Sequence, residues 1–305
     1  MYDLIIVGGG PAGTAAGVYA ARKKLKTALI TPEFGGQSQV SEDIQNWIGT
    51  ISISGNDLAK NLRAHVEAYA DGVLAIVEEK VSAVLKDGDI FTIKTGKGTY
   101  TTKTVLVATG SHRRKLTVPG AKEFDNKGIT YCASCDGPLF SGRDVVVVGG
   151  GNAGFETAAQ LLAYTKSVTL LEYGETFKAE PITVNKVLTN TKMKAFNNAE
   201  IVKITGDKMV TGLVYKDIKR GEEMELTIGG VFVEIGQVPT TEFVKGLVEF
   251  NKYNQIVIDP WTQRTSVPGI WAAGDCANIR YHQNNIAAGD AVKAIEDIFV
   301  FLKAA

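Results

Sequence analysis

Two cysteines three residues apart are the side chains best suited to chemistry. Cys132 and Cys135 form a Cys-x-x-Cys motif, and Asp136 follows directly. Such a pair closes a small disulfide ring, and the thiolate of one cysteine can exchange with another disulfide. Asp136 could carry a proton to or from that thiolate, or it could cap a helix or turn. The motif therefore favours a redox site whose acid–base partner is Asp136.

The main alternative for this motif is half of a zinc site. A tetrahedral site needs two further ligands, and the remaining candidates are Cys276 and three histidines without paired spacing. We therefore predict no metal site. We interpret Cys276, which follows Asp275, as a small buried residue rather than as a third redox thiol.

Two glycine-rich motifs indicate the elements that would supply this pair with electrons. Gly8 to Gly13 and Gly149 to Gly154 each follow a short apolar strand, at 4–7 and 145–148, and each opens a helical stretch. Such a turn places the pyrophosphate of a dinucleotide at the N-terminus of the helix, where free N–H groups and the helix dipole favour negative charge. The flanking strand and helix supply the context that makes the motif specific.

The two halves remain similar beyond the glycine motifs. A second strand follows each helix, at 27–30 and 168–171, and alternating runs typical of antiparallel strands come next. Each half then has an apolar strand that ends in glycine, at 105–108 and 231–233. The chain therefore predicts an α/β fold with two Rossmann-like dinucleotide-binding domains, and two bound nucleotides.

Composition limits the function further. The 305 residues include 33 Lys and Arg and 33 Asp and Glu, so the formal net charge is zero. That balance argues against a nucleic-acid groove or a membrane surface as the main partner. No apolar run approaches a membrane span, and no signal-peptide pattern is visible. Three cysteines do not make a disulfide framework, so a cytoplasmic location is expected.

The order of these motifs resembles that of the low-molecular-weight thioredoxin reductases, over essentially the whole chain. The stretches 135–140 and 170–172 look closest to the reductase portion of the flavoprotein component of alkyl hydroperoxide reductase. That flavoprotein carries N-terminal thioredoxin-like domains, whereas this sequence begins at its first Rossmann strand. We therefore expect a separate chain to carry the electrons onward. The resemblance rests on Gly8–Gly13, Gly35-Gly36-Gln37, Asn46-Trp47, Ala108-Thr109-Gly110, Val118-Pro119-Gly120, Cys132–Gly137, Gly149–Gly154 and Ala272-Ala273-Gly274-Asp275.

The resemblance implies three-layer ββα domains, of which the first binds FAD and the second a nicotinamide dinucleotide. The FAD-binding domain would be discontinuous, over 1–112 and 246–305, and the NAD(P)H-binding domain at 113–245 would carry the dithiol. Glu33, past the end of the second strand, is a candidate for the FAD ribose. The other residues implied for FAD are Gly8, Gly10, Pro11, Ala12, Gly13, Gly36, Gln37, Asn46, Thr109, Gly110, Gly274, Asp275 and Gln283.

Glu172 points to the identity of the nicotinamide. A carboxylate at the end of this strand accepts hydrogen bonds from the ribose hydroxyls of NAD, although Glu172 could also be an exposed strand-end residue. NADPH-using relatives hold the 2′-phosphate there with a histidine and several basic residues, of which only Lys178 is kept. A phosphate roughly 4 Å from Glu172 would be opposed by about 4 kcal/mol per charge pair. We therefore predict that NADH is preferred, bound by Gly149, Gly151, Asn152, Ala153, Gly154, Glu172, Lys178 and Gly236.

The resemblance implies a homodimeric flavoprotein disulfide reductase. Electrons would pass from NADH through FAD to the Cys132–Cys135 disulfide, and on to a thioredoxin, a glutaredoxin-like protein or a related dithiol protein. Cys135 would be the cysteine nearer the flavin, and Cys132 would attack the partner. Two sequence departures fall near the flavin: His282 replaces a basic residue beside Gln283, and Ile48 replaces a proline.

Two alternative functions stay open. One is a thioredoxin reductase whose electrons come from ferredoxin, but the intact second glycine motif argues against it. The other is a flavin-bound redox sensor that signals through its dithiol without steady turnover.

Overall fold

The computed structural model describes residues 1–41 and 43–304 and divides into two compact units. The first unit comprises 1–112 and 238–305, and the second comprises 113–237. Two crossing strands, β7 (Ser111–Arg113) and β16 (Gln237–Pro239), pair with each other as a two-stranded sheet. The sequence placed the return of the chain at 246, which is too late, because Val244 is fully buried in the apolar core of the first unit.

A seven-stranded sheet forms the first unit, in the order β3-β2-β1-β6-β5-β4, with β17 also paired to β6. Parallel pairing joins β3 to β2, β2 to β1, β1 to β6 and β6 to β17. Antiparallel pairing joins β6 to β5 and β5 to β4. The strands are β1 (Tyr2–Val7), β2 (Thr27–Ile30), β3 (Leu74–Val77), β4 (Val81–Asp87), β5 (Ile90–Thr95), β6 (Thr99–Val107) and β17 (Ile270–Ala272).

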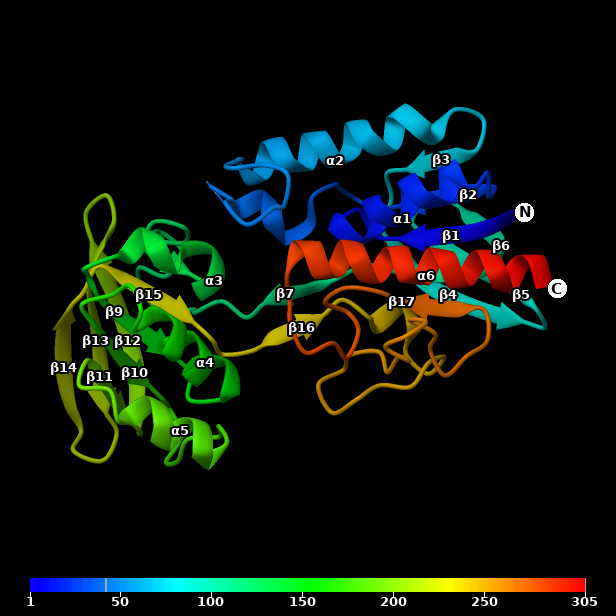
Figure 1. The fold of residues 1–305 in the computed structure, drawn as a ribbon. Helices are drawn as coiled ribbons and strands as arrows, with labels where there is room; N and C mark the ends of the chain where they lie inside the picture. The colour runs from blue at the N-terminus through cyan, green and yellow to red at the C-terminus, as the bar shows by residue number, and fades with distance from the viewer. Residues whose placement is uncertain (42, 305) are drawn as a thin grey trace. The chain divides into compact units, whose positions relative to one another are not determined.

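Strand β1 is buried on both faces. Leu4 and Ile6 belong to the core cluster that includes α1 (Pro11–Arg22), α2 (Gly55–Ala70) and α6 (Asn284–Ala304). Ile5 and Val7 belong to the cluster formed with β4 and β5. Because successive side chains of a strand alternate between faces, an uninterrupted apolar run suits a strand between two layers. Figure 1 shows α1 and α6 packed side by side in this unit.

The second unit repeats the design with a five-stranded parallel sheet in the order β11-β10-β9-β15-β8. Val145 and Val147 of β9 pack toward α4, while Val146 and Val148 pack toward a three-stranded antiparallel sheet. The strands are β8 (Ile129–Thr130), β9 (Asp144–Val148), β10 (Ser167–Leu171), β11 (Met193–Phe196) and β15 (Gly230–Val233), with β12 (Ala199–Gly206), β13 (Val210–Asp217) and β14 (Glu222–Thr227) in the smaller sheet.

Helices cover the other face of the five-stranded sheet (Figure 1). They are α3 (Ala133–Asp136), α4 (Asn152–Leu161) and α5 (Pro181–Leu188). A short 3₁₀ helix, η2 (Gly137–Phe140), also lies in the second unit, and two others, η1 (Gly36–Val40) and η3 (Glu242–Val244), lie in the first. The three layers of sheet, sheet and helix confirm the predicted α/β fold with two Rossmann-like units.

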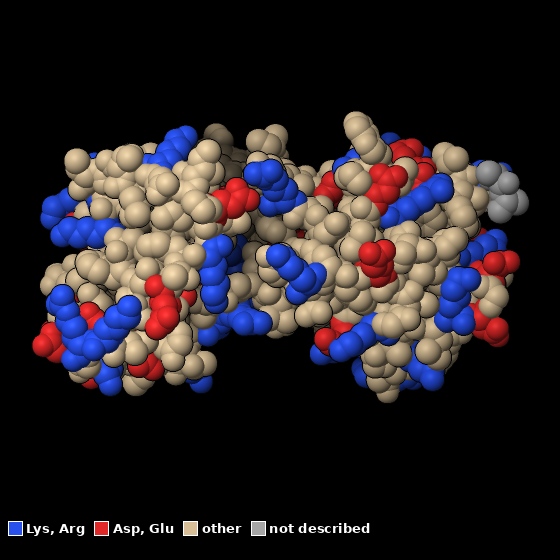
Figure 2. Space-filling view, turned by 90° about the horizontal axis from the view of Figure 1, so that it is seen from below, with Lys and Arg blue, Asp and Glu red and all other residues tan. Residues whose placement is uncertain are grey.

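Side chains of both charge signs are interspersed on each unit, on the face that Figure 2 shows. On this face (Figure 2), neither unit carries charged side chains of one sign only. Among residues 1–41 and 43–304, none of the helices combines the length and apolar character that crossing a membrane requires.

Candidate active site

The two glycine turns have the same geometry. A Cβ atom on Gly13 would lie 1.8 Å from the carbonyl oxygen of Gly8, and one on Gly154 would lie 1.8 Å from that of Gly149. No side chain fits at that distance, so Gly13 and Gly154 allow each helix to pack directly against its strand. Gly8 and Gly149 have φ values of +118° and +117°, which favour glycine.

The middle of each turn is open instead. A Cβ on Gly10 would have its nearest neighbour 4.0 Å away, and one on Gly151 would meet nothing within 4 Å. Helices α1 and α4 begin at these residues without a side-chain cap and without an acidic residue in the first turn. The free N–H groups and the helix dipole therefore face an open space, which fits the pyrophosphate of a dinucleotide.

Other predicted FAD residues gather around the start of α1, where Pro11 takes the first helical position. A Cβ on Gly36 would lie 3.4 Å from the Cα of Gly10. A Cβ on Gly274 would lie 3.4 Å from the Cβ of Ala12 and 3.2 Å from that of Ala287. The start of η1, the segment that follows β17 and the start of α6 thus meet the first glycine turn.

The predicted flavin-side amides come from distant parts of the sequence. The Nδ2 atom of Asn46 donates to Oε1 of Gln283 at 3.1 Å, and Asn285 donates to the carbonyl of Asn46 at 2.7 Å. The side-chain amide of Gln37 donates to the carbonyl of Ser111. The fold therefore brings Asn46 and Gln283 together, as a shared contact with one ligand would require.

The remaining predicted FAD residues are also placed in the first unit. Asp275 contacts His282, with 3.2 Å between Oδ1 and Nδ1. Thr109, which precedes Gly110 at the end of β6, donates its hydroxyl to the carbonyl of Thr240 at 2.7 Å. Glu33 is exposed, so its carboxylate is free to meet a ribose.

Glu172 is held behind the second glycine turn. Its Oε2 atom accepts from the amide of Gly150 at 2.6 Å, and its Oε1 atom accepts from the amide of Gly174 at 2.7 Å. The residue is 8 % exposed, so its reading as an exposed strand-end residue is wrong. The amide of Lys178 donates to the carbonyl of Gly150 at 2.9 Å, which holds this segment against the same turn.

The other predicted NAD residues divide into two groups. Asn152 and Ala153 start α4, and the side-chain oxygen of Asn152 accepts from the amide of Glu180 at 2.8 Å. Gly236 instead lies on a crossing, where its carbonyl accepts from the amide of Arg114 at 3.0 Å. The structure thus gathers the glycine turn, Glu172 and Lys178, and it places Gly236 on the connection between the units.

Cys132 and Cys135 are joined by a disulfide in the second unit. The one-turn helix α3 begins at Cys132, whose sulfur accepts from the amide of Cys135 at 3.2 Å. The hydroxyl of Ser134 donates to Gln160 of α4 at 2.8 Å. The dithiol is therefore attached to the same helix that begins at the second glycine turn. Within 1–41 and 43–304, no group of three metal-ligating side chains is present.

Asp136 does not act as a cap. Its side chain makes no cap hydrogen bond to η2, which follows it, and it instead accepts a hydrogen bond from the hydroxyl of Thr130 at the end of β8. Burial raises the pKa of Asp136, and the hydrogen bond from Thr130 acts in the opposite direction. The cap alternative is wrong, and Thr130 is a neighbour that the sequence analysis missed.

A second buried carboxylate lies beside the second glycine turn. Glu234 follows β15, and its side chain accepts from Thr157 of α4 at 2.8 Å and pairs with Arg113 of β7 at 3.2 Å. Burial raises its pKa, whereas Arg113 and Thr157 lower it. This cluster ties β15 and α4 to the first crossing strand, and the sequence analysis did not single it out.

Cys276 is fully buried, as interpreted from the sequence. Its thiol lies 3.4 Å from the carbonyl oxygens of Val107 and Ala273, and burial raises its pKa to about 11. We expect two of the three cysteines of the reduced native protein to react rapidly with Ellman's reagent at pH 8, and Cys276 only after denaturation. Three thiols that react at one rate in the native state would contradict this assignment.

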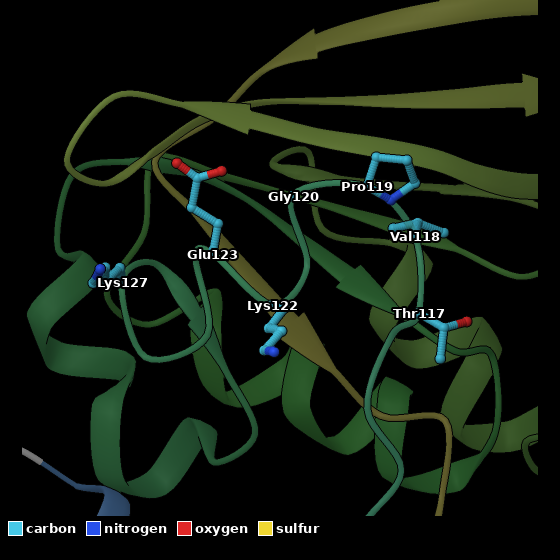
Figure 3. A pocket seen from close by; sticks show the side chains of 7 residues that line it. All are labelled: Thr117, Val118, Pro119, Gly120, Lys122, Glu123 and Lys127. Atoms are coloured by element: carbon cyan, nitrogen blue, oxygen red, sulfur yellow. The ribbon is translucent and has the colours of Figure 1, made fainter.

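A surface hollow of about 720 Å³ lies elsewhere in the second unit (Figure 3). Its lining contains neither the dithiol nor the glycine turn, so the candidate site is built on the other residues described above. The hollow is lined by Thr117, Val118, Pro119, Gly120, Lys122, Glu123 and Lys127.

The structure combines two Rossmann-like units with a Cys132–Cys135 disulfide in the second unit, and known proteins share this combination of folds. The family model described as pyridine nucleotide-disulphide oxidoreductase matches residues 2–291. The thioredoxin reductase structures from Streptococcus pyogenes MGAS5005 and Giardia duodenalis are 33 % and 32 % identical, with TM-scores of 0.92 and 0.93. These matches cover 100 % and 99 % of this chain, and 99 % of each of the two others.

Two relatives are longer than this chain. The protein named NADH dehydrogenase from Bacillus subtilis (strain 168) is 40 % identical, and the F component of alkyl hydroperoxide reductase from Escherichia coli (strain K12) is 38 % identical. Each match covers 99 % of this chain but 58 % of the relative. The chain belongs to the pyridine nucleotide-disulphide oxidoreductase family, and this membership implies a flavin and a pyridine nucleotide as cofactors.

Proposed function

We propose that the chain is a flavoprotein disulfide reductase that carries electrons from NADH to a thioredoxin-like protein disulfide. The observation that carries this proposal is the Cys132–Cys135 disulfide, which lies in the unit that holds the second glycine turn. A structural disulfide would need neither a nucleotide site nor a buried carboxyl group beside it. A disulfide reductase uses a nucleotide site to reduce its own disulfide, and a carboxyl group beside the dithiol can transfer protons during thiol–disulfide exchange.

The first unit would hold FAD. The start of α1 at Gly10 would bind the pyrophosphate, and the pair Asn46 and Gln283, together with Gln37, would hydrogen-bond the flavin end. Asp275 would bind the ribityl chain and Glu33 the ribose. When bound, the flavin supplies the two-electron carrier between the nicotinamide and the disulfide.

The chain's own residues would then perform the exchange. In the reduced dithiol, the Cys132 thiolate attacks one sulfur of the partner disulfide, so that a mixed disulfide forms and the partner's other sulfur leaves as a thiolate. The Cys135 thiolate then attacks Cys132, which closes the internal disulfide and releases the partner's second sulfur. The two protons lost by the dithiol end on the partner's two thiols, and Asp136 transfers one of them.

The preference for NADH rests on the position of Glu172. Two backbone amides hold its carboxylate directly behind the turn at Gly150, where the adenosine ribose of a dinucleotide would lie. Each carboxylate oxygen keeps a lone pair that can accept from a ribose hydroxyl. A 2′-phosphate there would meet a buried negative charge, and within the sequence 172–178 the one basic residue is Lys178.

Steady-state kinetics with each nucleotide tests the proposal. With a thioredoxin as acceptor, we expect kcat/KM for NADH to exceed that for NADPH at least about tenfold, which corresponds to roughly 1.4 kcal/mol. Both measurements use one preparation of the flavin-loaded protein. An equal or higher value with NADPH would refute the preference for NADH.

The same preparation distinguishes the alternatives. Flavin bleaching by reduced ferredoxin but not by NADH would favour the ferredoxin-dependent reductase. Bleaching without repeated turnover on any protein disulfide would favour the sensor. A homodimer, a cytoplasmic location and a dithiol-protein partner remain part of the proposal.

A further inference from the structure

Thr130 can act on the dithiol indirectly, through its hydrogen bond to Asp136. It is the last residue of β8 and is 6 % exposed, and β8 is fixed to the central sheet by its parallel pairing with β15. Its hydroxyl donates to Oδ2 of Asp136, the residue that follows Cys135. The amide of Asp136 donates to the carbonyl of Cys132 at 3.0 Å. The carboxyl group is thus attached to the sheet on one side and to the dithiol turn on the other.

We propose that Thr130 is a positioning residue for proton transfer at the dithiol, and that its hydroxyl holds the Asp136 carboxyl group in place and favours its charged form. The inference rests on the proposed disulfide exchange, in which Asp136 takes the proton of the attacking thiol. Without this donor, a larger share of the Asp136 carboxyl group would be in the neutral form, which cannot accept a proton, because burial favours that form.

The electrostatic surroundings of Asp136 support this role. Burial raises the pKa of Asp136, the hydrogen bond from Thr130 lowers it, and within 1–41 and 43–304 no charged side chain contributes to its shift. The titratable groups on its own helix are Cys132 and Cys135. On β8, the neighbouring Tyr131 directs its hydroxyl to Asp125 at 2.8 Å, and from α4 the neutral Gln160 meets Ser134. Thr130 is therefore the polar contact that acts on the charge of Asp136.

The thiol of Cys132 gives its proton to the Asp136 carboxylate as its sulfur bonds to the partner disulfide. That disulfide breaks, and the protonated Asp136 then gives the proton to the departing thiolate. No oxidant or reductant beyond the reduced dithiol and the partner disulfide is needed.

Four variants test the inference. Thr130→Val removes the hydroxyl but keeps the shape, and Thr130→Ser restores the donor. Asp136→Asn identifies which limb of the plot of rate against pH depends on the ionisation of Asp136. Thr157→Val is the matched control, because Thr157 is also 6 % exposed and also donates to a buried carboxylate, that of Glu234. The measurement is the single-turnover rate of the prereduced protein with an oxidised thioredoxin between pH 5 and 9.

We expect Asp136→Asn to remove the limb that rises with pH, and Thr130→Val to move that limb to higher pH. On its lower part the Thr130→Val rate is then about five- to tenfold below that of the parent protein, because a hydrogen bond to a charged group is lost. Thr130→Ser and Thr157→Val should leave the limb in place. A Thr130→Val profile that coincides with that of the parent protein would overturn the inference.

A second measurement separates this inference from the proposed function. In protein labelled with ¹³C at the aspartate carboxyl groups, the resonance that disappears in Asp136→Asn titrates without any partner or turnover. A resonance that titrates at higher pH in Thr130→Val, in a protein that reduces no protein disulfide, would refute the proposed function but support the role of Thr130. An unchanged resonance in an active protein would refute the role of Thr130 alone.

Discussion

Replacement of Cys132 by serine is expected to abolish reduction of a protein disulfide and to leave reduction of the flavin by NADH intact. The attacking sulfur is lost, while both glycine turns and the residues around them are unchanged. We expect the rate with oxidised thioredoxin to fall at least about a hundredfold, as it does when a nucleophile is removed. Anaerobic bleaching of the flavin by NADH, followed by absorbance, measures the step that should remain.

Two further substitutions complete this experiment. In Cys135→Ser the attacking thiol is present but cannot be released from the mixed disulfide, so a covalent complex with a protein of thioredoxin fold should accumulate. Cys276→Ser is the matched control, because it removes a thiol that is buried in the first unit. Full activity of Cys132→Ser, or capture of no such protein by Cys135→Ser, would contradict the proposed exchange.

The glycine turns could be predicted because their requirements are local. A short apolar strand, three spaced glycines and a helix determine the close contact at Gly13 and Gly154, and no distant residue needs to be known. The uninterrupted apolar runs at 4–7 and 145–148 likewise predicted strands, and such runs are typical of strands that are buried on both faces. For the same reason, the repeated order of elements was sufficient to predict two Rossmann-like units.

What the sequence left undetermined depends on contacts between distant segments. The pairing of Asn46 with Gln283 and the hydrogen bond from Thr130 to Asp136 arise only when separate elements pack together. The burial of Glu172 likewise requires the backbone amides of Gly150 and Gly174 to face it. The late boundary at 246 has a similar origin, because a short segment around Val244 is assigned to the first unit only by its packing.

The two glycine turns differ in the residue that follows the strand packed against each of them. The strand that packs on Gly8 is followed by the apolar Ala108, whereas the strand that packs on Gly149 is followed by Glu234, whose carboxylate is bonded to Thr157 and Arg113. The second turn is therefore tied by polar contacts to a crossing strand. The two copies share the part of the turn that would meet a pyrophosphate but differ in the part that faces the rest of the unit.

This division of roles within a turn leads to the expectation that Gly151→Ala weakens NADH binding in a protein that is otherwise intact. The added methyl group meets nothing within 4 Å and occupies the space that the pyrophosphate would need. We expect the dissociation constant for NADH to rise at least about tenfold, while the free energy of unfolding changes by less than about 1 kcal/mol. Isothermal titration with NADH and thermal unfolding measure the two quantities, and the FAD content should stay unchanged.

Matched glycines show whether this loss is specific. Gly154→Ala places a methyl group 1.8 Å from a carbonyl oxygen, so it should lower both stability and NADH binding. Gly96→Ala adds a methyl group in open space far from either turn in sequence, so it should change neither. Gly10→Ala, at the corresponding position of the first unit, should remove FAD and leave NADH binding measurable. Because we assign the two nucleotides to separate turns, normal NADH affinity in Gly151→Ala would refute the assignment of the second turn, and normal FAD content in Gly10→Ala would refute that of the first.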